Sequence, residues 1–528
     1  MTETGAPDMS DTTTPPRSAA RRKPSSSTPT PSPAPGYRLR VRMYRHGLGD
    51  CFLLSFPRAG STPLQMLIDC GALARDKLKM TELVTGIRDT LRAEGGGKAR
   101  LDVVVGTHEH QDHVSGFNQA RPVFNDDIDI GSVWLAWTED LDQQAQQQIR
   151  QAKAKTVDRL AGMVDKARAQ PGLAGSAASL GAVEDLLGFS RTDDSTGAGR
   201  VADAMAYLKQ RGKAAGDLRF LSPGGAPFAL PGHDGVRVYV LGPPKDPGWL
   251  KTSAITGRMK DGNVVYNLAA RGDSGLQALE AALDSQAGLA GDTGHPFAPV
   301  HRFRFHEPAA ASTAATAAAS AAAAPSNSAP KAPDAAIRQF LTATYDDPAQ
   351  AWRRIDGDWL ASLEQLALDL DNDTNNTSLV LAFEFVADGR VLLFPADAQI
   401  GSWLSWADLD FKLPGQAQAV KVDALLNRTV FYKVGHHCSH NATAKLGGLE
   451  QMTQGDLVAF IPLDKATAAS RGSKEAGGWD MPAPALFKAL QRKTGQRLVI
   501  SDVNEVPPPQ ALAAGISATP LFIDYFLR

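Results

Sequence analysis

Cysteine is scarce in this chain of 528 residues, which contains only Cys51, Cys70 and Cys438. Three thiols are too few, and odd in number, for a disulfide framework, and this usage is typical of a reducing compartment. Long apolar runs are missing as well. No stretch is long enough to span a bilayer, and the first residues lack the apolar core of a secretory signal. We therefore expect a soluble, cytoplasmic protein with no membrane partner.

An excess of charge of either sign is also missing. The chain has 55 Lys and Arg against 57 Asp and Glu, which gives a formal net charge of −2. No global basic field is therefore available to attract nucleic acid. A basic groove can still form locally in a neutral protein, so nucleic acid remains open as a partner.

Composition divides the chain into a core and three less regular regions. Residues 1–36 are rich in Ser, Thr and Pro, which predicts a disordered tail. Strand and helix patterns occupy residues 37–528 as one domain. They are interrupted by a helical insertion at about 141–220 and by a second at about 245–375, which is helical and partly disordered around its alanine-rich centre. If a protein partner binds, we expect it at the tail or the insertions.

A strand followed by metal-ligand residues is the most informative feature of the sequence. The apolar run Leu101–Gly106 contains three consecutive valines and predicts a buried strand. Four polar side chains follow it within six residues: His108, His110, Asp112 and His113. A buried strand is a rigid base, and the loop that leaves it would present three imidazoles and a carboxylate. This pattern is typical of a metal site.

Two later strands end in the same way. Val391–Phe394 is followed by Asp397, and Val430–Val434 is followed by His436 and His437. In an open sheet, groups that follow the carboxyl ends of strands gather at one edge. We therefore expect these side chains to converge with those of the first loop.

The residue types limit the metal. Imidazoles and carboxylates suit Zn²⁺, and also Mn²⁺ or Fe²⁺. Two cations need about six protein ligands, and a carboxylate can bridge them. A structural zinc site is the other interpretation, but such sites are usually closed and rich in cysteine. The sequence therefore favours an open site for two divalent metal ions, with zinc the first choice.

Residues His108–His113 read HEHQDH, which is similar to the HxHxDH signature of the metallo-β-lactamase family. More narrowly, four stretches resemble the lactamase-like domain of the ComEC-type DNA-uptake proteins: His46–Phe56, Leu67–Gly71, Asn376–Phe383 continued through LLFPAD, and Lys433–Asn441. The resemblance covers about half of the chain. It implies the α/β (α+β) class, as a four-layer αββα metallo-β-lactamase sandwich with the helical and low-complexity insertions added.

The resemblance also implies roles for single residues. It assigns His108 and His110 to one metal, Asp112, His113 and His437 to the other, and Asp397 to both as a bridge. Asp112, Asp397 and His437 are then the catalytic residues. The remaining polar residues of the matching motifs would orient ligands or contact substrate, namely His46, Asp50, His436, Ser439 and His440.

One part of the family pattern is missing. The usual family carries a third histidine on the first metal, between HxHxDH and the bridging Asp. The candidates are His233, His295, His301 and His306. His233 lies in a turn before a strand, so we expect it at the opposite end of the sheet. The first metal, held by His108 and His110, is therefore either weakly bound or completed by an insertion.

The resemblance implies a metal-dependent hydrolase in which a hydroxide bound to two metals attacks the substrate. A phosphodiester, in nucleic acid or a nucleotide, is the first substrate hypothesis. A small ester, lactone, thioester or lactam is the second. A third hypothesis is a catalytically silent module that binds metal or docks a partner.

Overall fold

The structure is a computed structural model, and it describes residues 36–73, 79–140, 201–250, 335–347, 371–471 and 478–528, with scattered residues of 147–187 and 367–370. The chain divides into two units, Met1–Pro35 and Gly36–Arg528. The tail expected at 1–36 lies outside the described residues except for Gly36, and so do the alanine-rich segment and most of both insertions.

Eight of the described strands form one mixed sheet in the order β18-β19-β1-β2-β3-β5-β7-β8. Neighbours from β18 to β3 are antiparallel, and neighbours from β3 to β8 are parallel. The strands are β1 (Leu39–Tyr44), β2 (Cys51–Arg58), β3 (Ser61–Cys70), β5 (Val103–Gly106), β7 (Val133–Ala136), β8 (Leu218–Leu221), β18 (Ile516–Ala518) and β19 (Phe522–Leu527).

Seven others form a second sheet in the order β17-β16-β15-β12-β11-β10-β9, in which β12, β15, β16 and β17 are parallel. These strands are β9 (Phe228–Leu230), β10 (His233–Gly242), β11 (Val380–Phe385), β12 (Val391–Phe394), β15 (Thr429–Lys433), β16 (Val458–Ile461) and β17 (Leu498–Ile500). Two small pairs join β4 (Arg100–Leu101) to β6 (Asp129–Ile130), and β13 (Asp410–Phe411) to β14 (Val420–Lys421).

The described helices are α1 (Met80–Glu94), α2 (Gln111–Gln119), α3 (Arg121–Asp127), α6 (Val201–Ala215), α7 (Pro247–Leu250), α10 (Ala335–Leu341), α12 (Ile400–Ser405), α13 (Val422–Asn427), α14 (Lys465–Ala469), α15 (Pro484–Lys493) and α16 (Pro509–Ala513). Among them, none combines the length and the apolar character needed to cross a membrane.

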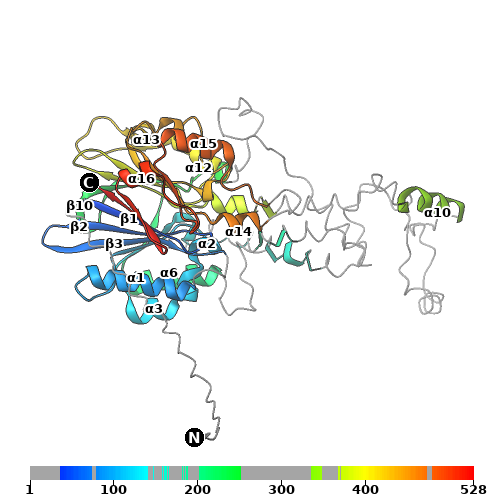
Figure 1. Cartoon of the computed structure of the whole chain (residues 1–528), viewed down its shortest axis with the longest axis horizontal. Helices are drawn as coiled ribbons and strands as arrows, with labels where there is room; N and C mark the ends of the chain where they lie inside the picture. The colour runs from blue at the N-terminus through cyan, green and yellow to red at the C-terminus, as the bar shows by residue number, and fades with distance from the viewer. Residues whose placement is uncertain are drawn as a thin grey trace, which may run out of the picture. The chain divides into compact units, whose positions relative to one another are not determined.

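Alternation along the strands builds three cores. In β5, Val103 and Val105 face a core shared by the two sheets, whereas Val104 faces a core formed with α1, α2, α3 and α6. A third core lies between the seven-stranded sheet and α12, α13 and α15. Figure 1 shows α1, α3 and α6 beside β3, and α12, α13 and α15 on the opposite side of this unit. The mixed α/β class expected from the sequence is therefore confirmed.

The strand β1 alternates cationic and apolar residues, and all six of its residues are buried. Its cationic residues are not on a solvent face, because Arg40 and Arg42 are each 1% exposed. The Arg42 guanidinium donates to both carboxylate oxygens of Asp524 on β19, at 2.8 Å each. Arg40 pairs with Glu94 on α1. Buried ion pairs therefore join the first strand to the last strand and to the outer helix.

The last part of the first insertion, from Val201, packs against the eight-stranded sheet. The helix α6 packs Met205 and Leu208 into the core that contains α1 and α2, and β8 pairs with β7. An apolar stripe at helical spacing places α6 against the sheet instead of outside it. Residues from Val201 onward therefore belong to the core of this unit.

Candidate metal centre

The site lies where strands of the two sheets end. In one sheet β5 ends at Gly106, and in the other the parallel strands β12 and β15 end at Phe394 and Lys433. The two edges are tied together directly, because the backbone N–H of Leu379 donates to the carbonyl of Thr107 at 2.9 Å. The loops after these strands therefore face one another.

The ligand loop after β5 leads directly into a helix. The helix α2 begins at Gln111, so Asp112 and His113 stand in its first turn. The positive end of a helix favours a carboxylate at this point.

The turn before β2 rests on the start of α2. The backbone N–H of Asp50 donates to the carbonyl of Asp112 at 2.9 Å, and that of Gly71 donates to the carbonyl of Asp50 at 3.1 Å. A Cβ on Gly71 would collide with the backbone of Asp112 and His113, so glycine allows this close approach. His46 contacts the carbonyl of Gly71 at 2.7 Å, and it therefore supports this turn.

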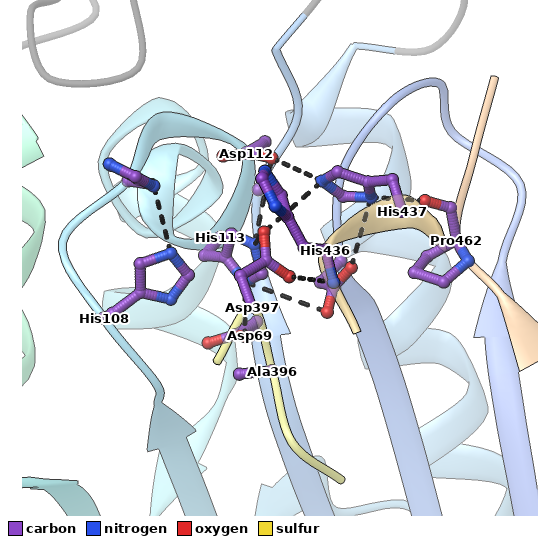
Figure 2. A network of polar contacts seen from close by, with 12 residues as sticks. Asp69, His108, Asp112, His113, Ala396, Asp397, His436, His437 and Pro462 are labelled. Carbon is purple, nitrogen blue, oxygen red and sulfur yellow. Dashed lines mark hydrogen bonds and ion pairs between the residues drawn. The ribbon is translucent and has the colours of Figure 1, made fainter. Parts of the chain in front are cut away.

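Four buried residues form the centre of the site. One ligand atom from each of Asp50, His113, Asp397 and His437 lies within 4.8 Å of the others, so the group could hold a metal ion. His113 Nε2 lies 2.9 Å from Asp397 Oδ2, and His437 Nε2 lies 3.6 Å from the same oxygen. Figure 2 shows the two rings directed at Asp397. Three of the four were expected as ligands, and Asp50 was expected only to orient them.

Asp112 lies at the side of this group. Its Oδ2 is 2.8 Å from His437 Nε2 and 3.8 Å from His113 Nε2 (Figure 2). Asp112 Oδ1 and Asp50 Oδ1 are buried and have no hydrogen-bond partner among the described residues. Buried carboxylate oxygens without donors are costly unless a cation satisfies them, so these residues fit a metal ion.

Each central imidazole is held so that Nε2 faces inward. The carboxylate of Asp69 lies 2.8 Å from His113 Nδ1, and the carbonyl of Pro462 lies 2.5 Å from His437 Nδ1. A carbonyl and a carboxylate accept hydrogen bonds, so Nδ1 of each ring carries the proton. Partners of this kind fix the tautomer and orientation of metal-binding histidines.

Asp69 also acts on a second ring. It accepts the hydroxyl of Thr107 at 2.7 Å, and the Thr107 oxygen lies 3.1 Å from His108 Nδ1. His108 Nδ1–H can then donate to that oxygen, which leaves Nε2 for a ligand. We did not single out Asp69 in the sequence. The sequence did contain a signal, because Asp69 follows the apolar residues Leu67 and Ile68 at the end of a strand. A charged residue in such a buried position needs partners.

Lys433 was also missed. It is 1% exposed, and its Nζ lies 2.6 Å from Asp50 Oδ2 and 3.2 Å from Asp397 Oδ1. It donates to the carbonyl of Ala396 at 2.8 Å as well. A lysine that ends an apolar strand and precedes two histidines was the signal. The ammonium holds both carboxylates in place and balances part of their charge.

Charge in this buried space shifts the pKa values of the histidines. Burial lowers the pKa of His113, but the carboxylates of Asp397 and Asp50 outweigh it and raise that pKa well above its usual value. Burial also lowers the pKa of His437, but Asp397 and Asp112 outweigh burial and raise it. These carboxylates therefore favour the protonated form of both rings, and a cation would displace those protons.

The same partners act on the carboxylates. Burial raises the pKa of Asp397, but His113 and Lys433 outweigh it, and the pKa falls well below its usual value. The pKa of Asp112 is lowered in the same way by His113 and His437. Burial prevails only at Asp50, whose pKa is raised. Asp112 and Asp397 therefore remain ionised, as metal ligands must be.

His108 and His110 form a neighbouring pair. His108 Nε2 lies 3.1 Å from His110 Nδ1, and the ring centroids of His108 and His113 are 4.2 Å apart. The pair is therefore beside the central group without belonging to it. His110 also faces Asp371, whose Oδ1 lies 3.6 Å from Nε2.

The loop after β15 holds the paired histidines in a strained backbone. His436, His437 and Cys438 have φ values of 39°, 50° and 68°. Such values are costly for residues other than glycine, and residues that adopt them cluster at functional sites. The backbone N–H of His436 donates to Asp397 Oδ1 at 3.0 Å, so the strained loop helps to fix the central carboxylate.

The ring of His436 contacts polar side chains outside the four-residue group. It contacts the hydroxyl of Ser439 at 2.8 Å and the amides of Asn375 and Gln399 at 3.4 Å. Burial lowers the pKa of His436 to about 4, so the ring is neutral. The hydroxyl of Ser439 forms its hydrogen bonds within the same loop, and His440 is exposed.

The third histidine of the family pattern is not among the described residues at this site. His233 begins β10, which runs parallel to β12, so it lies at the end opposite Asp397, as expected. Its ring packs against Phe56 at 5.9 Å between centroids. His295, His301 and His306 lie outside the described residues.

Comparison with models of known protein families gives no match, and comparison with curated proteins gives none either. Inferences about function therefore rest on the residues and geometry of the buried cluster.

Proposed function

We propose that this chain is a metal-dependent hydrolase of the metallo-β-lactamase fold that acts on phosphodiesters. The observation that carries the proposal is the convergence of Asp112, His113, Asp397 and His437 from three separate segments. Two facing sheets with helices outside each support the four-layer αββα arrangement. The sequence stretches that resemble the ComEC-type domain supply Asp50, Asp397 and His437, and the HEHQDH motif supplies the other ligands. The proposal includes the cytoplasmic location inferred from cysteine usage.

The residues fit two divalent cations. His108 Nε2 and His110 Nδ1 would hold the first, and Asp112, His113 and His437 the second, with Asp397 between them. Asp50 can add an oxygen to the second. Zn²⁺ is the first choice for this mixture of imidazoles and carboxylates, and Mn²⁺ or Fe²⁺ also suit it. Bound cations of this kind would polarise the substrate and lower the pKa of a metal-bound water, so that hydroxide is available at neutral pH.

The chain's own groups prepare the site for that chemistry. Asp69 and Pro462 direct Nε2 of His113 and His437 inward. Lys433 and the backbone N–H of His436 hold Asp397 Oδ1, so its Oδ2 faces the two imidazoles. The cluster is buried, and a low dielectric strengthens every charge interaction that forms as charge develops in the transition state.

A metal-supplemented reporter screen tests the function. Purified full chain, loaded with Zn²⁺, Mn²⁺ or Fe²⁺, is assayed with a bis(nitrophenyl) phosphate and with a nitrophenyl ester. We expect phosphodiester turnover that falls by at least about 100-fold in Asp112→Ala, because a metal ligand is lost. Asp388→Ala is the matched control, since this carboxylate pairs with Arg38 on the surface.

The other outcomes separate the hypotheses. Turnover of the ester alone would replace the phosphodiester with the small-molecule alternative. Metal uptake without turnover of either reporter would favour a silent metal-binding or docking module. Turnover that is equal in Asp112→Ala and wild type would contradict the site itself.

A further inference from the structure

Residues 371–375, none of which is assigned as a metal ligand, lie close to His110 of the first histidine pair. Asp371 is 5% exposed and lies at the end of the second insertion, just before β11. Its Oδ1 is 3.6 Å from His110 Nε2, and its Oδ2 accepts the side-chain amide of Asn375 at 3.0 Å. The carboxylate is therefore oriented toward His110 by a partner one helical turn away.

The orientation of His110 indicates what this carboxylate does. The ring directs Nδ1 toward His108 Nε2, at 3.1 Å. A cation shared by both rings needs a lone pair on each of these two nitrogens. Neutral imidazole has one protonated nitrogen, so Nε2 of His110 must then carry the hydrogen. That nitrogen is the one that faces Asp371.

We propose that Asp371 is a positioning residue of the first metal site: its carboxylate accepts the Nε2–H of His110 and directs Nδ1 toward the cation. This inference rests on the proposed function, because it assumes a cation at His108 and His110. The 3.6 Å separation is longer than a hydrogen bond, and such bonds tighten when a site is filled.

The same segment is linked to the other side of the site. The amide of Asn375 lies 3.4 Å from His436 Nε2, and the backbone N–H of His436 holds Asp397. Segment 371–375 thus connects His110 to the loop of the bridging carboxylate. The end of the second insertion supplies polar support at the first metal, where the family pattern lacks its third histidine.

Zn²⁺ binding measures this role without an activity assay. Metal-free full chain is titrated with Zn²⁺ against a chromophoric chelator. We expect wild type to bind two equivalents, and Asp371→Ala to bind one of them about 10–100-fold more weakly. Asp371→Glu should restore part of the loss, because it retains a carboxylate. Asp388→Ala is the control, since this carboxylate pairs with Arg38 on the surface.

A double-mutant cycle separates positioning from other roles. If Asp371 acts through His110, then Asp371→Ala should have no further effect on Zn²⁺ binding in His110→Ala protein. An additive loss would overturn the proposal and indicate direct ligation. Equal weakening of both equivalents would also overturn it, as a structural effect, and so would an unchanged affinity.

The outcomes also distinguish the two proposals. Wild type that binds two equivalents but hydrolyses neither reporter removes the proposed function and leaves the role of Asp371 intact. Wild type that hydrolyses the phosphodiester while Asp371→Ala binds Zn²⁺ normally removes only this inference. Wild type that binds no Zn²⁺ removes both. Thermal unfolding of each metal-free variant shows whether it is folded.

Discussion

His437 Nε2 lies 2.8 Å from Asp112 Oδ2, although 325 residues separate the two along the chain. One residue follows a strand of the seven-stranded sheet, and the other begins a helix on the eight-stranded sheet. Their contact exists only when both sheets are assembled. Metal binding at this point is therefore coupled to folding of the whole unit.

Removal of the central carboxylate should abolish stable metal binding. Asp397 Oδ2 faces both His113 and His437, so Asp397→Ala removes the oxygen that they share. We expect less than half of the wild-type metal content, measured by elemental analysis after dialysis. Asp388→Ala, on the same hairpin, is expected to retain it. Equal metal content in Asp397→Ala and wild type would rule out the assigned ligands.

Asp69 should affect both metals. It contacts His113 directly and His108 through Thr107, and these rings belong to different metals in the proposal. Asp69→Ala is therefore expected to weaken both Zn²⁺ equivalents by about 10–100-fold, as measured by chelator competition. Asp371→Ala should weaken only one. If Asp69→Ala affects a single equivalent, the link through Thr107 is wrong.

Lys433 should matter most in the metal-free protein. Lys433→Met leaves Asp50 and Asp397 without their buried cation, which destabilises a protein by about 3–5 kcal/mol. Zn²⁺ supplies positive charge in its place, so the loss should be smaller when zinc is bound. Urea unfolding with and without Zn²⁺ measures the difference. Lys421→Met, at an exposed pair with Asp410, is the control. Equal losses in the two states would contradict this account.

Glu384 should make stability depend on acid pH. Burial raises its pKa, but Arg428, Tyr239 and Arg237 outweigh burial and lower it below the usual 4.5. The unfolded chain therefore takes up the proton at a higher pH than the folded chain. This stabilisation is complete above the unfolded pKa and is lost as the pH falls through the folded pKa.

Glu384→Gln should consequently lose less stability than wild type between about pH 6 and pH 3, measured by urea unfolding at each pH. Glu82→Gln, an exposed carboxylate on α1, should follow wild type. A wild-type profile identical to that of Glu384→Gln would show that the network does not favour the ionised form.

The sequence predicted which segments meet better than it predicted which atoms meet. Strand-ending motifs located the side chains of His113, Asp397 and His437. Asp397 and His437 follow parallel strands of one sheet, whereas His113 follows a strand of the other, so the site joins two sheet edges instead of the single edge expected. The sequence did not single out Asp69, Lys433 or Asp371. Their roles depend on the side of the backbone to which each side chain points and on the residues that pack opposite it. That information comes from the assembly of two sheets and is not local to any motif.

Burial of charged residues cannot be read from local pattern either. The residues of β1 alternate between cationic and apolar types, yet Arg40 and Arg42 are buried. Their partners Glu94 and Asp524 lie far away in the sequence, on α1 and β19. A cationic residue is ordinarily exposed unless it is paired. No local pattern identifies a partner at that separation.

The Arg42–Asp524 pair has a consequence for biosynthesis. β1 lies between β2 and β19 in the sheet, and Asp524 is made 482 residues after Arg42. Until the ribosome has produced β19, β1 has an open edge and Arg42 lacks its carboxylate partner. The eight-stranded sheet therefore cannot close while the chain is being synthesised. Completion of this sheet is a late event, and the nascent chain carries an unpaired strand edge that a chaperone could protect.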